Sequence, residues 1–217
     1  MPARFASKGV LMLAAAGFSA AATAPSLPFE QAFDTKAAPR AFHARVSYRG
    51  PDGTHRMELW RDGEARLRRD TDGRLTTIAT HRAGDPAYRL DLYDHVRRIH
   101  SVLDRESLYR VGRFTDWRDL AYGVRHPATD YAITPAKVRV VTPPIGKCDW
   151  YALESQGRRS LICWSRTDAF PLLIRDAQGR ETWRVTARDN RPIDAGLFRP
   201  DARGYVLNKA AEEISGD

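Results

Sequence analysis

The alternation of apolar and polar residues in short segments is the feature that most constrains the fold of this chain. Apolar side chains occupy every second position from Phe42 to Tyr48, and the same pattern recurs in later segments. Such alternation is typical of strands with one buried and one solvated face. The segments predicted to be strands are 42–48, 57–59, 65–68, 74–80, 88–92, 97–102, 137–141, 148–154, 158–163, 171–175, 181–187 and 204–207.

Turn signals such as Asp62-Gly63 and Asp72-Gly73 separate these segments. Helical spacing appears in residues 104–122, where Thr115 can cap a short helix, and a second helix is expected at residues 29–36. The fold class is therefore mainly β with a few helices (α+β): a large curved antiparallel sheet, or an open barrel, that packs short helices on one face. Asp194 is expected to cap a further helical turn that ends at Phe198.

The first residues have the order of a secretory signal peptide. Arg4 and Lys8 form a basic head, residues 9–18 are apolar, and residues 19–24 are small. We expect cleavage after Ala22 and export to the periplasm. No cysteine lies near this point that could accept a lipid anchor.

A membrane anchor is the alternative reading, because no charge falls between Lys8 and Glu30. The strongly apolar part is far shorter than the roughly 20 residues that a membrane span needs, which favours the signal peptide. The predicted organisation is a signal peptide at residues 1–22, a single β domain at residues 23–207 and a polar tail at residues 208–217.

The charge of the chain is basic and scattered. Removing residues 1–22, which carry two cations and no acid, lowers the formal net charge from +8 to +6. No lysine-rich tail or aromatic-basic motif points to nucleic acid. Anionic lipid headgroups, through transient contact with a membrane surface, or an acidic protein surface suit this charge better. The alternative is that the arginines only cover solvated strand faces.

The two cysteines, Cys148 and Cys163, are predicted to form one disulfide in an oxidising compartment. A two-residue turn at Ser155 and Gln156 would place them directly opposite each other in a hairpin, close enough to bridge. No C-x-x-C motif is present, so we interpret the bond as structural.

The C-terminal part resembles the outer-membrane lipoprotein-sorting (LolA-like) superfamily. The residues that carry the resemblance are 170–180 (FPLLIRDAQGR), 190–198 (NRPIDAGLF, of the form N-x-x-(I/L)-D-x-x-x-F) and 204–206 (GYV). The resemblance implies a half-open antiparallel barrel closed by helices. It further implies that the concave face holds lipids, acyl chains or lipoprotein anchors, or that the fold serves as a regulatory module in the envelope. No arginine of this chain is matched to the ligand-contacting arginine of the family.

No catalytic motif is present: the chain lacks G-x-S-x-G, H-E-x-x-H, a P-loop and G-x-G-x-x-G. His95 and His100, with Asp91 and Asp94, form the only cluster that resembles metal ligands. On alternating strands these side chains diverge, and turn chemistry explains them better. We therefore expect no enzyme activity, no cofactor and no metal.

The function hypothesis is a periplasmic, non-catalytic carrier or binding protein for a hydrophobic ligand: a lipid, an acyl chain or an acylated lipoprotein. The alternative is an envelope regulatory or assembly module that binds another protein. Basic residues at the rim, Arg66 and Arg68, would meet headgroups. A filled core instead of a cavity is compatible with the same pattern. The apolar residues expected to line the concave face are Phe42, Val46, Tyr48, Met57, Leu59, Leu90, Leu92, Leu172, Ile174, Trp183 and Val185.

Overall fold

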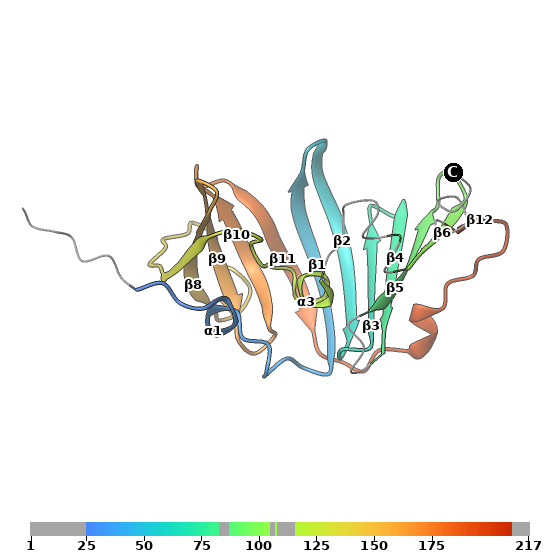
Figure 1. Cartoon of the computed structure of the whole chain (residues 1–217), viewed down its shortest axis with the longest axis horizontal. Helices are drawn as coiled ribbons and strands as arrows, with labels where there is room; N and C mark the ends of the chain where they lie inside the picture. Colours follow the sequence, from blue (N-terminus) through green and yellow to red (C-terminus); the bar gives the residue numbers. More distant parts are fainter. Residues whose placement is uncertain (1–24, 83–86, 105–106, 108–115, 210–217) are drawn as a thin grey trace, which may run out of the picture.

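The computed structural model describes residues 25–82, 87–104, 107 and 116–209, and these residues form one 12-stranded sheet (Figure 1). The predicted signal peptide lies outside the described residues. The strands are β1 (Ala41–Gly50), β2 (Gly53–Asp62), β3 (Arg66–Thr71), β4 (Leu75–His81), β5 (Tyr88–Asp94), β6 (Ile99–Leu103), β7 (Tyr131–Pro135), β8 (Asp149–Ser155), β9 (Arg158–Ser165), β10 (Phe170–Asp176), β11 (Glu181–Asp189) and β12 (Val206–Lys209).

The sheet is curved and open, with the strand order β12-β6-β5-β4-β3-β2-β1-β11-β10-β9-β8-β7. All pairings among strands β1 to β11 are antiparallel. This confirms the predicted mainly-β class and the half-open architecture. One pairing differs from the prediction: β12 pairs with β6 in parallel, because the chain crosses over from β11 through residues 190–205 before it reaches that edge.

The helices are shorter than the sequence pattern suggests. Helix α1 covers Phe29–Ala32 only, and α3 covers Trp117–Tyr122. The side chain of Asp116 caps α3 by accepting a hydrogen bond from the Arg118 N–H, whereas Thr115 lies outside the described residues. The helical turn η1 (Ala195–Phe198) begins after Asp194, whose carboxylate accepts from the Gly196 N–H, as predicted.

The predicted strand at residues 137–141 is wrong. The strand lies earlier, at β7, and residues 136–148 form a long loop without strand pairing. Its main-chain oxygens bond to side chains rather than to a neighbouring strand: Arg184 donates to the carbonyls of Thr142 and Pro143. Two consecutive prolines, Pro143 and Pro144, also lack the N–H groups that a strand needs.

The cysteine hairpin forms, but its register is two residues away from the prediction. The turn lies at Gln156 and Gly157, which both have positive φ (51° and 70°), as a tight two-residue hairpin turn requires. Cys163 is therefore opposite Trp150, and Cys148 reaches it diagonally with a Cα–Cα distance of 5.3 Å. A shift of two residues keeps every side chain on its predicted face, which explains why the disulfide still forms.

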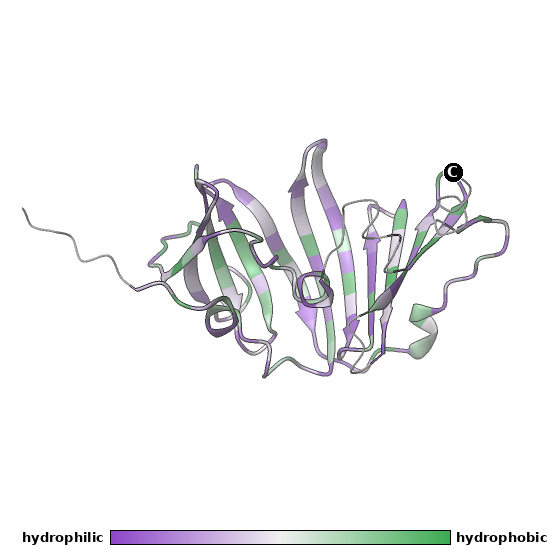
Figure 2. Ribbon diagram, viewed as in Figure 1, coloured by the Kyte–Doolittle hydropathy of each residue, from purple (hydrophilic) through white to green (hydrophobic). Residues whose placement is uncertain are grey.

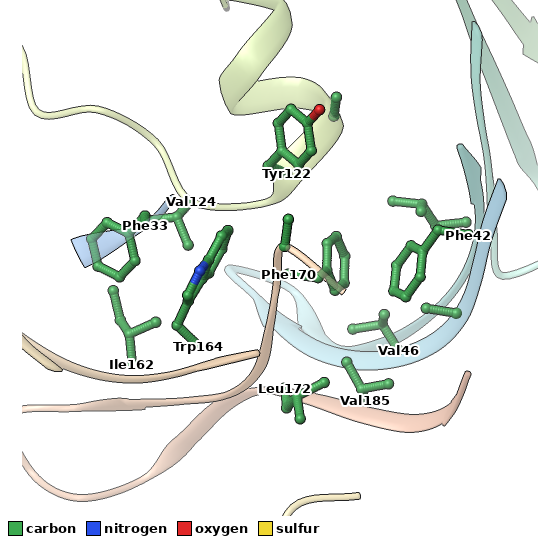
Figure 3. Close-up of a cluster of buried hydrophobic side chains, with 14 of the residues drawn as sticks. Phe33, Phe42, Val46, Tyr122, Val124, Ile162, Trp164, Phe170, Leu172 and Val185 are labelled. Carbon is green, nitrogen blue, oxygen red and sulfur yellow. The ribbon is translucent and has the colours of Figure 1, made fainter. Parts of the chain in front are cut away.

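The apolar core lies on the concave face, defined here as the face that carries Phe42 and Val46 and is covered by α1 and α3 (Figures 1 and 3). The opposite face is the convex face. Figure 2 shows apolar and polar residues alternating along the central strands, which separates these two faces. Near α1, Phe33 packs edge-on against Trp164 with ring centroids 5.4 Å apart. Both side chains are fully buried.

Candidate binding site on the concave face

Ten of the eleven apolar residues predicted to line the concave face belong to the buried core or pack against it. The six that are buried are Phe42, Val46, Met57, Leu59, Leu172 and Val185, and the four that pack against them while half-buried are Tyr48, Leu90, Ile174 and Trp183. Leu92 is half-buried at the β5 end of the same face. The structure therefore brings the predicted apolar set together, underneath short helices.

Helix α3 covers the middle of this face. Its Tyr122 is buried over the apolar cluster in which the rings of Phe42 and Phe170 are tilted by 54°, with centroids 5.0 Å apart (Figure 3). Trp117, at the start of α3, stacks on His81 with centroids 4.8 Å apart. Helix α3 thus covers the apolar middle of the concave face.

Arg61 is the most unusual residue of the concave face, because it is fully buried among apolar side chains. Its guanidinium donates to the main-chain oxygens of Asp168 (2.8 Å), Ala121 (3.2 Å) and Ala169 (3.4 Å). It also lies over the rings of Phe42 and Tyr122, at 4.9 and 4.4 Å from their centroids. Arg61 therefore joins β2 to α3 and to the start of β10.

Two further arginines donate to main-chain oxygens in or next to the helices. Arg69 of β3 donates to the main-chain oxygen of Leu120 in α3. Arg118 of α3 donates to the main-chain oxygen of Phe33, next to α1, and lies over the Phe29 ring at 4.8 Å. The last carbonyls of α3 are the natural acceptors for cations, because the helix leaves them without intrahelical partners.

The guanidinium groups of Arg61 and Arg69 are strongly desolvated. Burial lowers the pKa of Arg61 to about 10, against the opposing attraction of Tyr122 and Asp168, and burial likewise lowers the pKa of Arg69 to about 10. Both groups remain charged at neutral pH. Within the described part of the chain, neither forms a salt bridge with a carboxylate, and the Nε of each is buried without a hydrogen-bond partner.

The acid nearest to this system, Asp168, uses its carboxylate elsewhere. It is fully buried, with Oδ1 2.6 Å from Nη1 of Arg188 and Oδ2 accepting from the Ser165 hydroxyl at 2.6 Å. Only its main-chain oxygen is shared with Arg61. The concave face therefore combines apolar surface with positive charge that is balanced mainly by carbonyl dipoles.

The two basic residues predicted to meet headgroups lie on the convex face, because Arg68 pairs with Trp60 and alternates with the buried Leu67. Arg66 pairs with Asp62 and lies over the Phe198 ring at 4.7 Å. Arg68 holds Asp70 and donates to the Leu197 carbonyl at 2.6 Å. Both side chains thus attach η1 to β3 and do not join the apolar set.

The histidine and aspartate cluster of the sequence separates in the structure. His100 bonds to Asp91 at 2.8 Å, whereas His95 bonds to the hydroxyls of Thr76 (2.8 Å) and Tyr205 (2.6 Å). No group of three or more His, Cys, Asp or Glu residues that could hold a metal ion occurs among the residues that the structure describes.

A groove of about 630 Å³ lies on the convex face, where its lining mixes both signs of charge: Arg45, Arg56, Glu58 and Asp72. Two acids of this groove are engaged by histidines, since His43 bonds to Glu58 and His55 bonds to Asp72, both at 2.7 Å. None of the helices in the described residues is long and apolar enough to cross a membrane.

Sequence reasoning missed Arg61 and Arg69, although a signal was present. Arg61 continues the inward alternation of Met57 and Leu59, and Arg69 follows Leu67 by two residues. An arginine at an inward position of a strand is the pattern that would have identified both.

Comparison with known proteins shows little direct similarity. No protein-family model matches the chain, and no curated protein matches it in sequence. Among solved structures, the crystal structure of MucB is similar over 82% of this chain and 63% of that chain, with a TM-score of 0.40 and 13% sequence identity. This chain thus spans less than two thirds of that protein's length. We therefore infer a function from the residues of the concave face alone.

Proposed function

We propose that this protein is a non-catalytic binding protein of the cell envelope that holds an anionic amphiphile, such as a lipid or an acylated lipoprotein, on its concave face. The observation that carries the proposal is the pair Arg61 and Arg69: two desolvated cations on an apolar face, both bonded to main-chain carbonyls of α3. Helix α3 acts as a cover that the ligand displaces. The predicted signal peptide supports the location.

The chemistry of this exchange favours an anionic headgroup. A phosphate or carboxylate binds an arginine more strongly than a neutral carbonyl does, because the hydrogen bonds are then charge-assisted at both ends. An acyl chain would take over the contacts that Trp117 and Tyr122 make with the sheet, and would contribute about 25 cal/mol per Å² of apolar area before ordering costs.

The test is to purify the protein under mild conditions, to measure its mass under native conditions, and to identify any lipid after solvent extraction. The proposal expects a stoichiometric lipid or acyl species, and at least tenfold weaker binding of that species in Arg69→Met. Arg66→Met is the matched control, since Arg66 lies on the same strand and faces the convex side. An unliganded protein that also fails to bind added lipids and lipopeptides would contradict the proposal.

A second candidate function, a module that binds another envelope protein, is favoured by the β12 edge of the sheet. Val206 and Leu207 are 70% and 54% exposed there, and a strand edge can pair with an extended segment of a partner. A stoichiometric protein partner that is lost in Leu207→Pro, together with an unliganded concave face, would favour this candidate.

A further inference from the structure

The loop of residues 136–148 combines positive charge with an exposed apolar side chain. It contains Lys137, Arg139 and Lys147 and no acidic residue, and all three cations are exposed. The first acid after the loop, Asp149, is paired with Arg166. The loop therefore presents uncompensated positive charge.

Val141 has the most exposed side chain among the large apolar residues of the described chain, at 103% of its reference area. Its neighbour Val140 faces inward and packs against the core, as does Ile145. One side of the loop thus packs against the core, and the other side presents Val141 to solvent. An isolated exposed valine is ordinary, but Val141 is fully exposed and follows the exposed cations Lys137 and Arg139 at alternate positions of the loop.

The loop is fixed in this arrangement from several directions. Arg184 donates to the carbonyls of Thr142 (3.1 Å) and Pro143 (3.4 Å), and Arg175 donates to the carbonyl of Arg139 (3.4 Å). The disulfide of Cys148 holds the far end against β9. Because the loop is already ordered, little conformational entropy would be lost when its tip binds a surface.

We propose that this loop is a docking contact for an anionic lipid bilayer, with Val141 inserting at the headgroup level and Lys137, Arg139 and Lys147 binding lipid phosphates. Each cation near an anionic membrane surface raises the affinity by about fivefold. An apolar side chain at the tip adds the free energy of removing apolar surface from water, which charge alone does not supply. An acidic protein surface would satisfy the cations but would gain little from Val141. The contact does not depend on a ligand in the concave face.

The experiment is co-sedimentation of the processed protein with vesicles of phosphatidylcholine and phosphatidylglycerol in equal parts, compared with vesicles of phosphatidylcholine alone. We expect binding to the anionic vesicles only, weakened by salt. Arg139→Glu should reduce it by at least about fivefold, and Val141→Ser by about fivefold. Val141→Leu should strengthen it, which is a change that misfolding cannot imitate.

Val96→Ser is the matched control, because Val96 is 62% exposed and precedes two arginines in the β5–β6 turn. Its binding should equal that of the unmodified protein. Equal binding of all variants, equal loss in Val96→Ser and Val141→Ser, or no vesicle binding by the unmodified protein would each overturn the proposal. So would Arg139-dependent binding to an acidic protein in the absence of any vesicle binding.

Discussion

Arg61 shows at the residue scale how a buried cation can organise a sheet and a helix. It connects Ala121, Asp168 and Ala169, which are far apart in the sequence, through one guanidinium. Burial of its charge opposes folding and lowers its pKa. The hydrogen bonds that its guanidinium donates to three main-chain carbonyls favour folding.

Replacing Arg61 tests which of these effects is larger. Arg61→Met removes the buried charge but leaves three carbonyls without their donor, and each buried unsatisfied group costs about 1–3 kcal/mol. Because the removal of the buried charge offsets part of this cost, we expect the free energy of unfolding in urea to fall by about 2 kcal/mol. Arg97→Met, at an exposed position, should leave it unchanged. A more stable Arg61→Met protein would show that desolvation is the larger effect.

His55 gives a pH-dependent contribution at the β1–β2 hairpin. Hydrogen bonds, first to Asp72 (2.7 Å) and then to Asp52 (2.8 Å), raise the pKa of His55, and the same contacts help to lower the pKa of both carboxylates. The stability that protonated His55 contributes is fully present below about pH 6.5 and is lost as pH rises through its raised pKa. The stability that the ionised carboxylates of Asp52 and Asp72 contribute is present above about pH 4 and is lost as pH falls through their lowered pKa values.

The expected observation is a His55 titration, followed by NMR, with its midpoint above that of a model histidine. Asp72→Asn should move the midpoint downward, because Asp72 makes the largest contribution to the shift. A midpoint at the model value in the unmodified protein would contradict the ion-pair cluster.

At the scale of elements, the loop of residues 136–148 depends on the disulfide. Cys148 and Cys163 are 15 residues apart, and their bond joins the end of the loop to β9. Ile145, Cys148 and Trp150 are only partly buried and pack against the core from outside. The covalent bond compensates for limited burial at this place.

Removing the bond should therefore destabilise this part of the protein first. The double variant Cys148→Ser with Cys163→Ser should lose about 3 kcal/mol of stability, the value that chain entropy predicts for a loop of this length. Hydrogen exchange should increase in β8 and in the loop, while β2 to β4 stay protected. Uniform loss of protection across the sheet would show that the disulfide supports the whole fold.

At the scale of the whole molecule, Phe170 lies where the main packing groups meet. It is fully buried, contacts Phe42 of β1 (5.0 Å between centroids) and Trp183 of β11 (5.7 Å), and lies close to Gly123 after α3. The single sheet has no boundary within its described strands, so we expect one cooperative unfolding transition.

Phe170→Ala should reduce the free energy of unfolding by about 3–5 kcal/mol, because it leaves a cavity between the sheet and α3. Denaturation followed by both far-ultraviolet circular dichroism and tryptophan fluorescence should show coincident transitions. Separate transitions would indicate that the β7–β10 end and the β2–β6 end unfold independently.

The sequence by itself determined the fold class, the two faces of the sheet, the pairing of the cysteines and the helical turn after Asp194, because alternation and turn chemistry act over a few residues. It placed Phe42 and Val185 correctly on one face for the same reason. Only the tertiary structure decided the parallel position of β12, the loop at 136–148 and the roles of Arg61 and Arg69. Arg61 and Arg69 bond to residues that are 50 or more positions away in the sequence. Strands β12 and β6 are about 100 residues apart in the sequence. No local pattern encodes such contacts.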